Sequence, residues 1–325
     1  MIGPIILGNK TFASNLIQGP MAGYSCWPMR LLAQQWGQPA FCYTEMLSAK
    51  NLATHREIEP RFRVKDPNEG TLCVQLSGSN PDELSRATER VIGFGADLID
   101  LNCGCPVDKI RKKGAGSKLL EQPTLLAQLV KAMKLATSAT DIPISIKIRV
   151  DGDQTVQYSK TAALRAQDAG VNFIAIHGRH WTEDYDVPCR QDQIAEIVSA
   201  LTIPVIASGD AQDTASTLQL LKNTGAAGVM IARAGVGQPW LFAKIRAEAA
   251  GEKFVVPDIH SIGQLFLQHA KDLVSLEGEK IAVLQCRKLI KYYARPLENN
   301  TPLLNHANLA ERYDDLVSCV VNYFR

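Results

Sequence analysis

The segment Leu98-Ile99-Asp100-Leu101-Asn102-Cys103-Gly104-Cys105-Pro106 is an apolar run that ends in a turn with a cysteine directly before a proline. The run predicts a buried strand, and the carboxyl end of a parallel strand is where α/β folds place reactive groups. Seven similar runs lie along the chain, and most are followed by a helical pattern, which is typical of parallel βα units. The eight predicted strands are 15–19, 40–44, 72–76, 98–101, 142–148, 173–176, 204–207 and 228–231.

Eight strands with intervening helices over roughly 240 residues predict a (β/α)₈ TIM barrel, whose site lies at the carboxyl ends of the strands. A doubly wound sheet would use six of the runs, but the first turn lacks the G-x-G-x-x-G pattern of that fold. After about Ala250 the spacing becomes helical, over 261–275, 278–293 and 309–323. We therefore expect an α/β chain in which a TIM barrel, 1–248, is followed by a small C-terminal helical domain, 249–325.

The composition is that of an ordinary globular enzyme, with 46% hydrophobic and 21% charged residues among 325. A net charge of +2 places any nucleic-acid binding in a local patch rather than in the overall charge. The 8 cysteines lack the spacing of a disulfide framework or a zinc site, which predicts reduced thiols and no metal. Neither a signal peptide nor an apolar run of membrane-spanning length is evident. We expect a cytoplasmic protein that contacts no membrane and needs no obligate protein partner.

Two segments concentrate positive charge. One follows the cysteine turn and also holds Gly114 and Gly116. The other lies on one broad face of the helix predicted over 278–293, beside Tyr292 and Tyr293. Each alone could be a solvated surface, but two such segments favour a polyanionic substrate. Their basic residues are Lys109, Arg111, Lys112 and Lys113 in the first segment, and Arg287, Lys288, Lys291 and Arg295 in the second.

The ends of the predicted strands carry residues that suit one kind of ligand. The small residues from Gly19 to Gly23 let a flat ligand approach the backbone, and the amide of Gln75 suits the edge of a heterocycle. Lys147 and Arg149 lie on one side of their strand, and cations inside a barrel need an anionic partner. The last two strands end where such barrels commonly hold a phosphate. Together these features predict FMN, with Lys147 stabilising the anionic reduced flavin.

The chain resembles the tRNA-dihydrouridine synthase family in the order and spacing of eight segments, and the resemblance covers nearly its whole length. The most specific part is the N-x-G-C-P turn with the K-K-G-x-G that follows it. The resemblance implies NADPH-dependent reduction of particular uridines in tRNA to 5,6-dihydrouridine through bound FMN. The matching segments are Gly19-Pro20-Met21-Ala22-Gly23, Thr44-Glu45-Met46, Asn102-Cys103-Gly104-Cys105-Pro106, Lys112-Lys113-Gly114-Ala115-Gly116, Lys147-Ile148-Arg149, His177-Gly178-Arg179, Ser208-Gly209-Asp210 and Ala232-Arg233.

The resemblance also implies roles for single residues. Hydride would pass from flavin N5 to uracil C6 and Cys105 would protonate C5, whereas Cys103 would be a packing residue. Asn102 would hold the uracil edge or ribose of a base splayed into the site, and the two basic segments would contact tRNA phosphates. Arg149 and Arg179 are further expected substrate contacts. The expected FMN contacts are Pro20, Met21, Ala22, Gln75, Lys147, His177, Ser208, Gly209, Asp210, Ala232 and Arg233.

Some residues depart from the family pattern. Ser208 and Ala232 stand where Asn and Gly are usual, which leaves the backbone N–H donors intact, and the stretch 180–188 is atypical. Two other functions stay open. An FMN barrel could act on a free small molecule of the dihydroorotate or dihydropyrimidine type, but the basic segments and the helical domain disfavour this. A flavin-less RNA-binding protein on an inactive barrel would leave Lys147, His177 and Cys105 unexplained.

Overall fold

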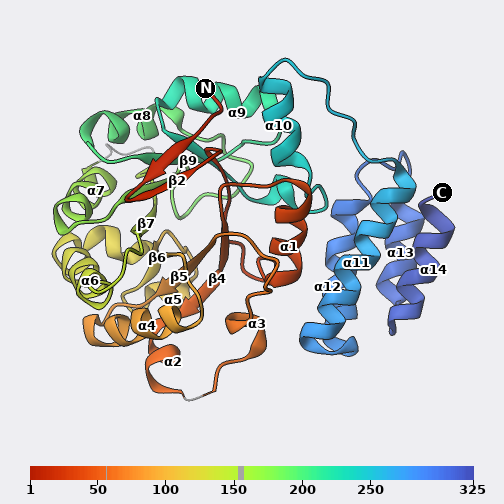
Figure 1. The fold of residues 1–325 in the computed structure, drawn as a ribbon, viewed down its shortest axis with the longest axis horizontal. Coiled ribbons are helices and arrows are strands. Elements are labelled where there is room, and N and C mark those ends of the chain that lie inside the picture. The colour runs from red at the N-terminus through yellow and green to blue at the C-terminus, as the bar shows by residue number, and fades with distance from the viewer. Residues whose placement is uncertain (56, 153–156) are drawn as a thin grey trace.

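Eight parallel strands close into a barrel, which confirms the predicted (β/α)₈ fold (Figure 1). The structure is a computed structural model that describes residues 1–55, 57–152 and 157–325. Around the barrel the strands follow the order β10-β3-β4-β5-β6-β7-β8-β9, and each predicted strand overlaps one of them. Their bounds are β3 (Leu16–Gln18), β4 (Cys42–Ser48), β5 (Leu72–Ser77), β6 (Leu98–Cys103), β7 (Ile144–Arg149), β8 (Phe173–His177), β9 (Val205–Ser208) and β10 (Gly228–Ile231).

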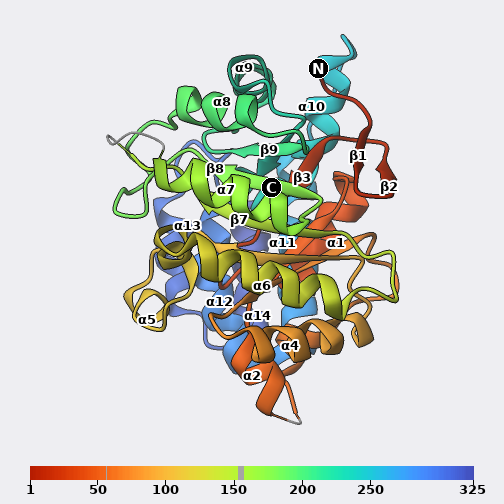
Figure 2. The same cartoon turned by 90° about the vertical axis from the view of Figure 1, so that its left-hand side faces the viewer.

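Helices cover the outside of the barrel, as Figure 2 shows for the side formed by α6 and α7. Because side chains also fill the interior, every residue of β3, β5, β8, β9 and β10 is buried. The helices are α1 (Trp27–Trp36), α2 (Ala49–Thr54), α3 (Pro60–Arg63), α4 (Pro81–Gly93), α5 (Asp108–Arg111), η1 (Gly116–Glu121), α6 (Pro123–Ala136), α7 (Gln157–Ala169), α8 (Gln191–Ala200), α9 (Thr214–Thr224), η2 (Arg233–Gly235) and α10 (Leu241–Ala249).

A hairpin that the sequence analysis did not predict packs at the amino-terminal end of the barrel. In it β1 (Ile5–Leu7) pairs antiparallel with β2 (Lys10–Phe12). The side chains of Ile5, Leu7 and Phe12 are buried in one cluster with residues inside the barrel, and the Phe12 ring lies 5.2 Å from that of Phe41. Strands of three residues are too short for a hydrophobic period to reveal them. The hairpin plugs the end opposite to the predicted site.

The C-terminal helices lie beside the barrel (Figure 1). They are α11 (Ile259–Glu277), α12 (Glu279–Tyr293), α13 (Thr301–Leu309) and α14 (Tyr313–Tyr323). Their apolar core also includes residues of α1 and of the segment after β10. The helix predicted over 309–323 begins too early, because Ala310 is extended and Asp315 accepts from the backbone N–H groups of 311 and 312 ahead of α14. Tyr293 belongs to the core rather than to the basic face, and its hydroxyl lies 2.9 Å from Nδ1 of His269. No helix in the described part of the chain is long and apolar enough to cross a membrane.

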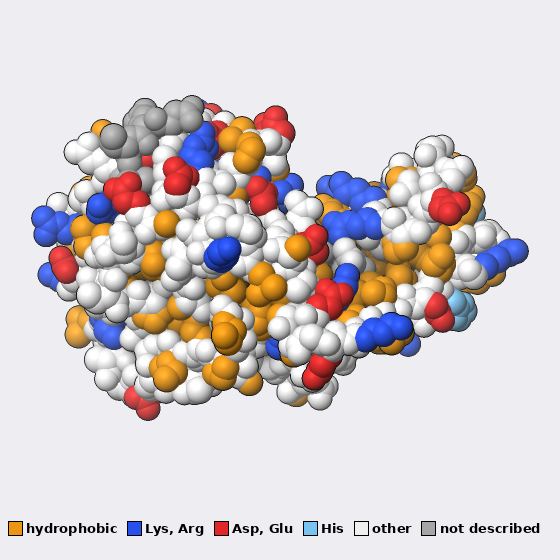
Figure 3. All heavy atoms as spheres, turned by 90° about the horizontal axis from the view of Figure 1, so that it is seen from above, with side chains coloured by type: hydrophobic (Ala, Val, Ile, Leu, Met, Phe, Trp, Pro, Cys, Tyr) orange, Lys and Arg blue, Asp and Glu red, His pale blue; other side chains and the backbone are white. Residues whose placement is uncertain are grey.

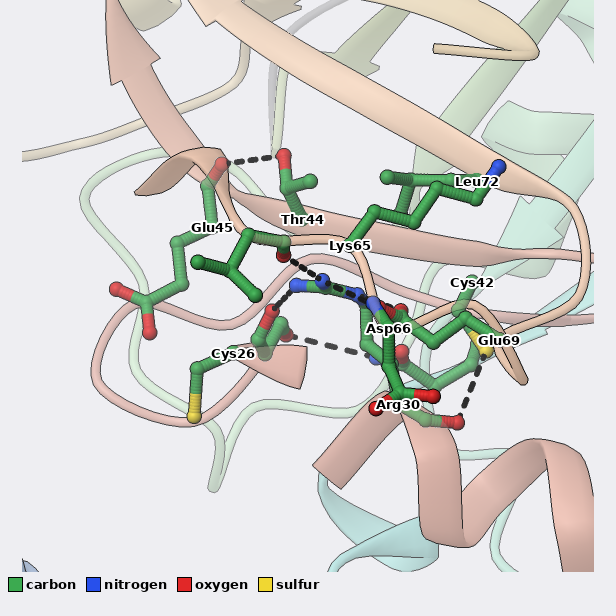
Figure 4. A network of polar contacts seen from close by, with 12 residues as sticks. Cys26, Arg30, Cys42, Thr44, Glu45, Lys65, Asp66, Glu69 and Leu72 are labelled. Carbon is green, nitrogen blue, oxygen red and sulfur yellow. Dashed lines mark hydrogen bonds and ion pairs between the residues drawn. The ribbon is translucent and has the colours of Figure 1, made fainter. Parts of the chain in front are cut away.

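Two ion networks fix segments beside the barrel. Arg30 of α1 pairs with Glu69 at 2.6 Å, and the two side chains are only 2% and 3% exposed (Figure 4). This pair ties the chain before β5 to α1. Arg61 of α3 pairs with Glu45 of β4 and, at 2.7 Å, with Glu277 of α11. The second network therefore links the barrel to the C-terminal helices.

Candidate active site

Two neighbouring strands, β6 and β7, each keep one partly exposed residue near the carboxyl end. Asn102 is the one residue of β6 that keeps partial exposure, and Lys147 is the one such residue of β7. The two are register partners on adjacent strands. The barrel interior is therefore reachable from outside at this level, beside the turn that carries Cys105.

Lys147 has an unusual environment for a lysine. Within the described part of the chain it forms no hydrogen bond and no ion pair. Burial, assisted by the charge of Arg149, lowers the pKa of Lys147 to about 8, and the charge of Asp100 opposes this shift. A cation in a barrel interior is costly unless an anionic or hydrogen-bond-accepting group meets it. Lys147 thus fits the acceptor edge of a ligand such as a flavin.

His177 ends β8 among positive charges. Burial, followed by the charges of Lys147, Arg149, Arg179 and Arg233, lowers the pKa of His177 well below its usual value. The imidazole is therefore neutral at physiological pH. The four cations make this end of the barrel electropositive, as a phosphate-bearing cofactor requires.

The turn that carries Cys105 is held on both sides. The side-chain oxygen of Asn102 accepts from the backbone N–H of Gly104 at 3.1 Å and of Cys105 at 2.8 Å. The Cys105 carbonyl accepts from the backbone N–H and the hydroxyl of Ser117, both at 3.0 Å. Gly116 has a φ of +62°, and a Cβ there would lie 2.7 Å from that carbonyl oxygen. The second glycine of K-K-G-x-G therefore lets the following loop close against the thiol-bearing turn.

The two cysteines of this turn lie in different environments. Cys103 is fully buried in the main hydrophobic core, and burial raises its pKa well above the usual value. Alternation along β6 explains this, because Cys103 points to the side opposite that of Asn102. Cys105 is partly exposed. It is therefore the accessible thiol of the pair, as expected, and its role in proton transfer stays a prediction.

The structure brings the predicted FMN contacts together. Pro20, Met21 and Ala22 lie in the loop after β3, where the Met21 N–H donates to the Ser25 hydroxyl at 2.8 Å. The remaining contacts lie near the carboxyl ends of five other strands or in the loops directly after them, and Gly209 has a φ of +127°. These positions suit a shared ligand, while the binding roles themselves stay predictions. The remaining contacts are Gln75, Lys147, His177, Ser208, Gly209, Asp210, Ala232 and Arg233.

Two predicted substrate contacts have partners within the protein. Arg179 is 2% exposed, and its guanidinium donates to the Asp210 carboxylate and to backbone carbonyls of 185 and 187. The Asp210 carboxylate is therefore engaged within the protein, and its predicted part in holding FMN stays a prediction. Arg149 donates from Nε to the Gly104 carbonyl at 2.9 Å, next to Cys105. The geometry favours a structural role for Arg179, which holds neighbouring loops. Arg149 lies beside the turn that carries the Cys105 thiol.

The atypical stretch after β8 contributes two aromatic side chains that the sequence analysis did not assign. The Arg111 guanidinium lies 3.5 Å from the Trp181 ring centre, and that of Arg233 lies 3.4 Å from the Tyr185 ring centre. These stacks tie the stretch to the loop behind Cys105 and to the loop after β10. In the sequence, these contacts were indicated only by the presence of aromatic residues in a loop. Their arginine partners could not be identified, because they are distant in sequence.

The two basic segments divide by residue type. Their three arginines bind the protein itself: Arg111 pairs with Glu121 at 3.2 Å, Arg287 donates to the Ala310 carbonyl at 2.7 Å, and Arg295 donates to carbonyls of 233, 234 and 236. Figure 3 shows a notch between barrel and helices with basic side chains on its helical side. The exposed lysines are Lys109, Lys112, Lys113, Lys288 and Lys291.

Other features of the surface carry less chemistry. In the described ranges no three His, Cys, Asp or Glu side chains gather into a group that could hold a metal ion. A hollow of about 480 Å³, lined by Ser14, Pro39 and Arg246 among others, adjoins the amino ends of β3 and β4. It lies at the end of the barrel opposite to Cys105.

Comparison with known proteins assigns the family. The sequence model of the dihydrouridine synthase (Dus) family matches residues 17–321. The chain belongs to this family. A probable tRNA-dihydrouridine synthase 1 of Synechocystis sp. is 34% identical over 293 residues, which cover 90% of this chain and 81% of that protein. The tRNA-dihydrouridine synthase B of Xanthomonas axonopodis pv. citri is 31% identical over 321 residues, which cover 98% and 95%.

Solved structures of low sequence identity share the fold of this Dus protein. The old yellow enzyme homologue from Zymomonas mobilis matches with a TM-score of 0.55 and 12% identity, over 80% of this chain and 95% of that chain. At such identity the likeness concerns the barrel fold alone. The family assignment confirms the resemblance drawn from the sequence motifs.

Proposed function

We propose that this Dus protein reduces specific uridines of tRNA to 5,6-dihydrouridine, with FMN as the bound cofactor and NADPH as the reductant. The observation that carries the proposal is Lys147, which within the described part of the chain has no hydrogen bond or ion pair and lies one strand away from the turn that presents Cys105. We assign FMN binding and catalysis to residues 1–248 and tRNA binding to residues 249–325. A cytoplasmic location and the absence of an obligate protein partner stay predictions.

FMN, when bound, supplies the hydride that reaches C6 of the uracil ring. Lys147 would then face the acceptor edge of the flavin and stabilise negative charge there. Neutral His177 can donate or accept a hydrogen bond without adding a further cation. Backbone N–H groups after β9 and β10, next to Arg233, would hold the phosphate.

Cys105 would complete the reaction by protonating C5. The thiol gives its proton to the carbon that carries the negative charge after hydride addition, and the resulting thiolate regains a proton from solvent. Asn102 and Ser117 hold the turn that presents the thiol. Asn102, which keeps partial exposure at the barrel opening, is also within the same layer as Lys147 and can meet the edge of the base.

The small-molecule alternative lacks a specific supporting observation. A small substrate such as dihydroorotate or a dihydropyrimidine would not need the exposed lysines of α12 or the C-terminal helices for binding. The flavin-less alternative gives no role to Lys147, for which the described residues provide no hydrogen bond or ion pair. A visible spectrum of the purified protein separates it from both enzymes, since bound oxidised flavin absorbs at roughly 370 and 450 nm.

The decisive experiment separates the two half-reactions with a matched pair of variants. Cys105→Ala should bind FMN and be reduced by NADPH at the wild-type rate, because neither step uses the thiol. Oxidation of its reduced flavin by tRNA should slow by roughly 10² or more, the usual effect of removing a positioned acid. Cys103→Ala, which loses only packing in the core, should turn over nearly normally.

Two outcomes would count against this assignment. If Cys103→Ala were inactive and Cys105→Ala active, the proton donor would be Cys103, and the assignment of Cys105 would be wrong. Wild-type reduced flavin that tRNA cannot oxidise would refute the proposed substrate. Mass spectrometry of tRNA from cells lacking the protein then identifies the uridine, through loss of its two-hydrogen mass increment.

A further inference from the structure

A row of buried polar side chains runs from the barrel interior to the cysteine turn. Gln75, Asp100 and Ser145 are register partners on β5, β6 and β7, with exposures of 1%, 0% and 0%. The Asp100 carboxylate accepts from the Ser145 hydroxyl at 2.6 Å and from the Gln75 side-chain amide at 2.8 Å. The Gln75 oxygen in turn accepts from Nδ2 of Asn102 at 2.8 Å. Asn102 is the residue whose oxygen holds the cysteine turn.

The hydrogen bonds in this row have one consistent direction. An ionised carboxylate can only accept, so Gln75 must turn its NH₂ group toward Asp100. Its oxygen then faces Asn102, which must donate from Nδ2 and keep its own oxygen toward the two N–H groups of the turn. Burial raises the pKa of Asp100 to about 6, opposed by its two hydrogen bonds and by the charge of Lys147. The group is therefore largely ionised at neutral pH.

We propose that Asp100 is a positioning residue, which sets the orientation of Asn102 through Gln75 and thereby the place of the Cys105 thiol. Asp100 has no ion pair among the residues that the structure describes, and burying such a carboxylate lowers stability, so its presence inside the barrel needs another explanation. The row provides one, because a neutral amide at position 100 could face Gln75 with either its oxygen or its nitrogen. The catalytic consequence rests on the proposed function, whereas the positioning itself does not.

The test measures the position of the thiol directly. Cys105 is alkylated by iodoacetamide in the folded full chain, and peptide mapping with fragment ions separates it from buried Cys103. In Asp100→Asn nothing in the row requires Gln75 to keep its oxygen toward Asn102. Where Gln75 turns, Nδ2 of Asn102 loses its acceptor, and the side chain that holds the cysteine turn is less firmly fixed. Alkylation of Cys105 should then accelerate by roughly tenfold. Cys189, partly exposed and outside the row, serves as the reference thiol.

A double variant gives a rescue that a merely structural role would not produce. In Asp100→Asn with Gln75→Glu, the carboxylate moves to position 75 and again only accepts. It can take one hydrogen bond from the new amide at 100, which reverses that bond, and another from Asn102, which restores the donation from Nδ2 of Asn102 to position 75. Alkylation of Cys105 should return to within about twofold of wild type. Ser145→Ala, the matched control, removes the other bond to Asp100 and should leave the rate unchanged.

The outcomes separate this inference from the proposed function. An unchanged Cys105 rate in Asp100→Asn, or a rate that the double variant does not restore, would overturn the positioning role. If Asp100→Asn does not accumulate as folded protein, Gln75→Met cuts the row while Asp100 stays, and an unchanged rate there has the same meaning. Wild-type protein whose thiol responds as expected but whose reduced flavin never reacts with tRNA would refute the function and leave the positioning intact.

Discussion

Replacing Lys147 by methionine should stabilise the flavin-free protein while weakening the flavin site. Methionine keeps the length of the side chain and removes its charge. Burial lowers the pKa of Lys147 from 10.5 to about 8, and each pH unit corresponds to ~1.4 kcal/mol. The cost of the charged form in the folded protein is thus about 3 kcal/mol, an upper limit because the side chain keeps partial exposure.

The pH dependence gives this prediction a second readout. Below pH 8 Lys147 is charged in both the folded and the unfolded chain, so the full penalty is present. Between about pH 8 and pH 10.5 the unfolded chain holds a proton that the folded chain has lost, and the free energy of unfolding should rise with pH. Lys147→Met should lack this rise, because it has no group that titrates there.

Urea unfolding of flavin-free protein, repeated from pH 7 to pH 10.5, measures both effects. Lys147→Met should unfold at higher urea than wild type at pH 7, and its affinity for FMN should fall. Lys131→Met, at an exposed position of α6, is the matched control and should change stability by less than about 0.5 kcal/mol. A flavin-free Lys147→Met that is less stable than wild type at pH 7 would refute the reasoning, and unchanged FMN affinity would remove Lys147 from the cofactor site.

Two further predictions concern charge. Reversing Lys112 and Lys113, or Lys288 and Lys291, to glutamate should weaken tRNA binding and flatten its dependence on salt, with FMN content retained; an unchanged salt slope would make these lysines solvated surface only. Arg30→Met should lower the free energy of unfolding by about 3–5 kcal/mol, because it leaves the buried carboxylate of its partner unpaired, and a loss below about 1 kcal/mol in urea unfolding would contradict this.

The sequence predicts the barrel well because of how its strands are buried. A parallel strand covered on both faces is largely apolar, and a predominantly apolar run marks each of the eight strands, even where polar residues interrupt β4, β6 and β7. The short hairpin β1–β2 and the break between α13 and α14 escape the pattern, since the first is too short and the second depends on a cap at Asp315. These features arise from local hydrogen bonds and packing that periodicity does not record.

The site was only partly predictable for a related reason. The strand ends and the accessible cysteine follow from motif and spacing, but partners across strands do not. Asp100 and Asn102 are polar residues two apart in an apolar strand, which alternation places on one face. That signal was present in the sequence. The contact of Asp100 with Gln75 needs the register of β5 against β6, which only the structure supplies.

The two basic segments contain more cations than are available to bind RNA, and the difference between arginine and lysine explains why. A guanidinium has five donors in a rigid fork, and in the three arginines of these segments the fork binds carboxylates or backbone carbonyls of this chain. An ammonium on a flexible stem has no such geometric match, and the five lysines stay exposed. Phosphate contacts should therefore fall mainly on the lysines. Arg295 would act by joining α12 to the loop after β10, which sets where the lysines stand relative to the flavin site.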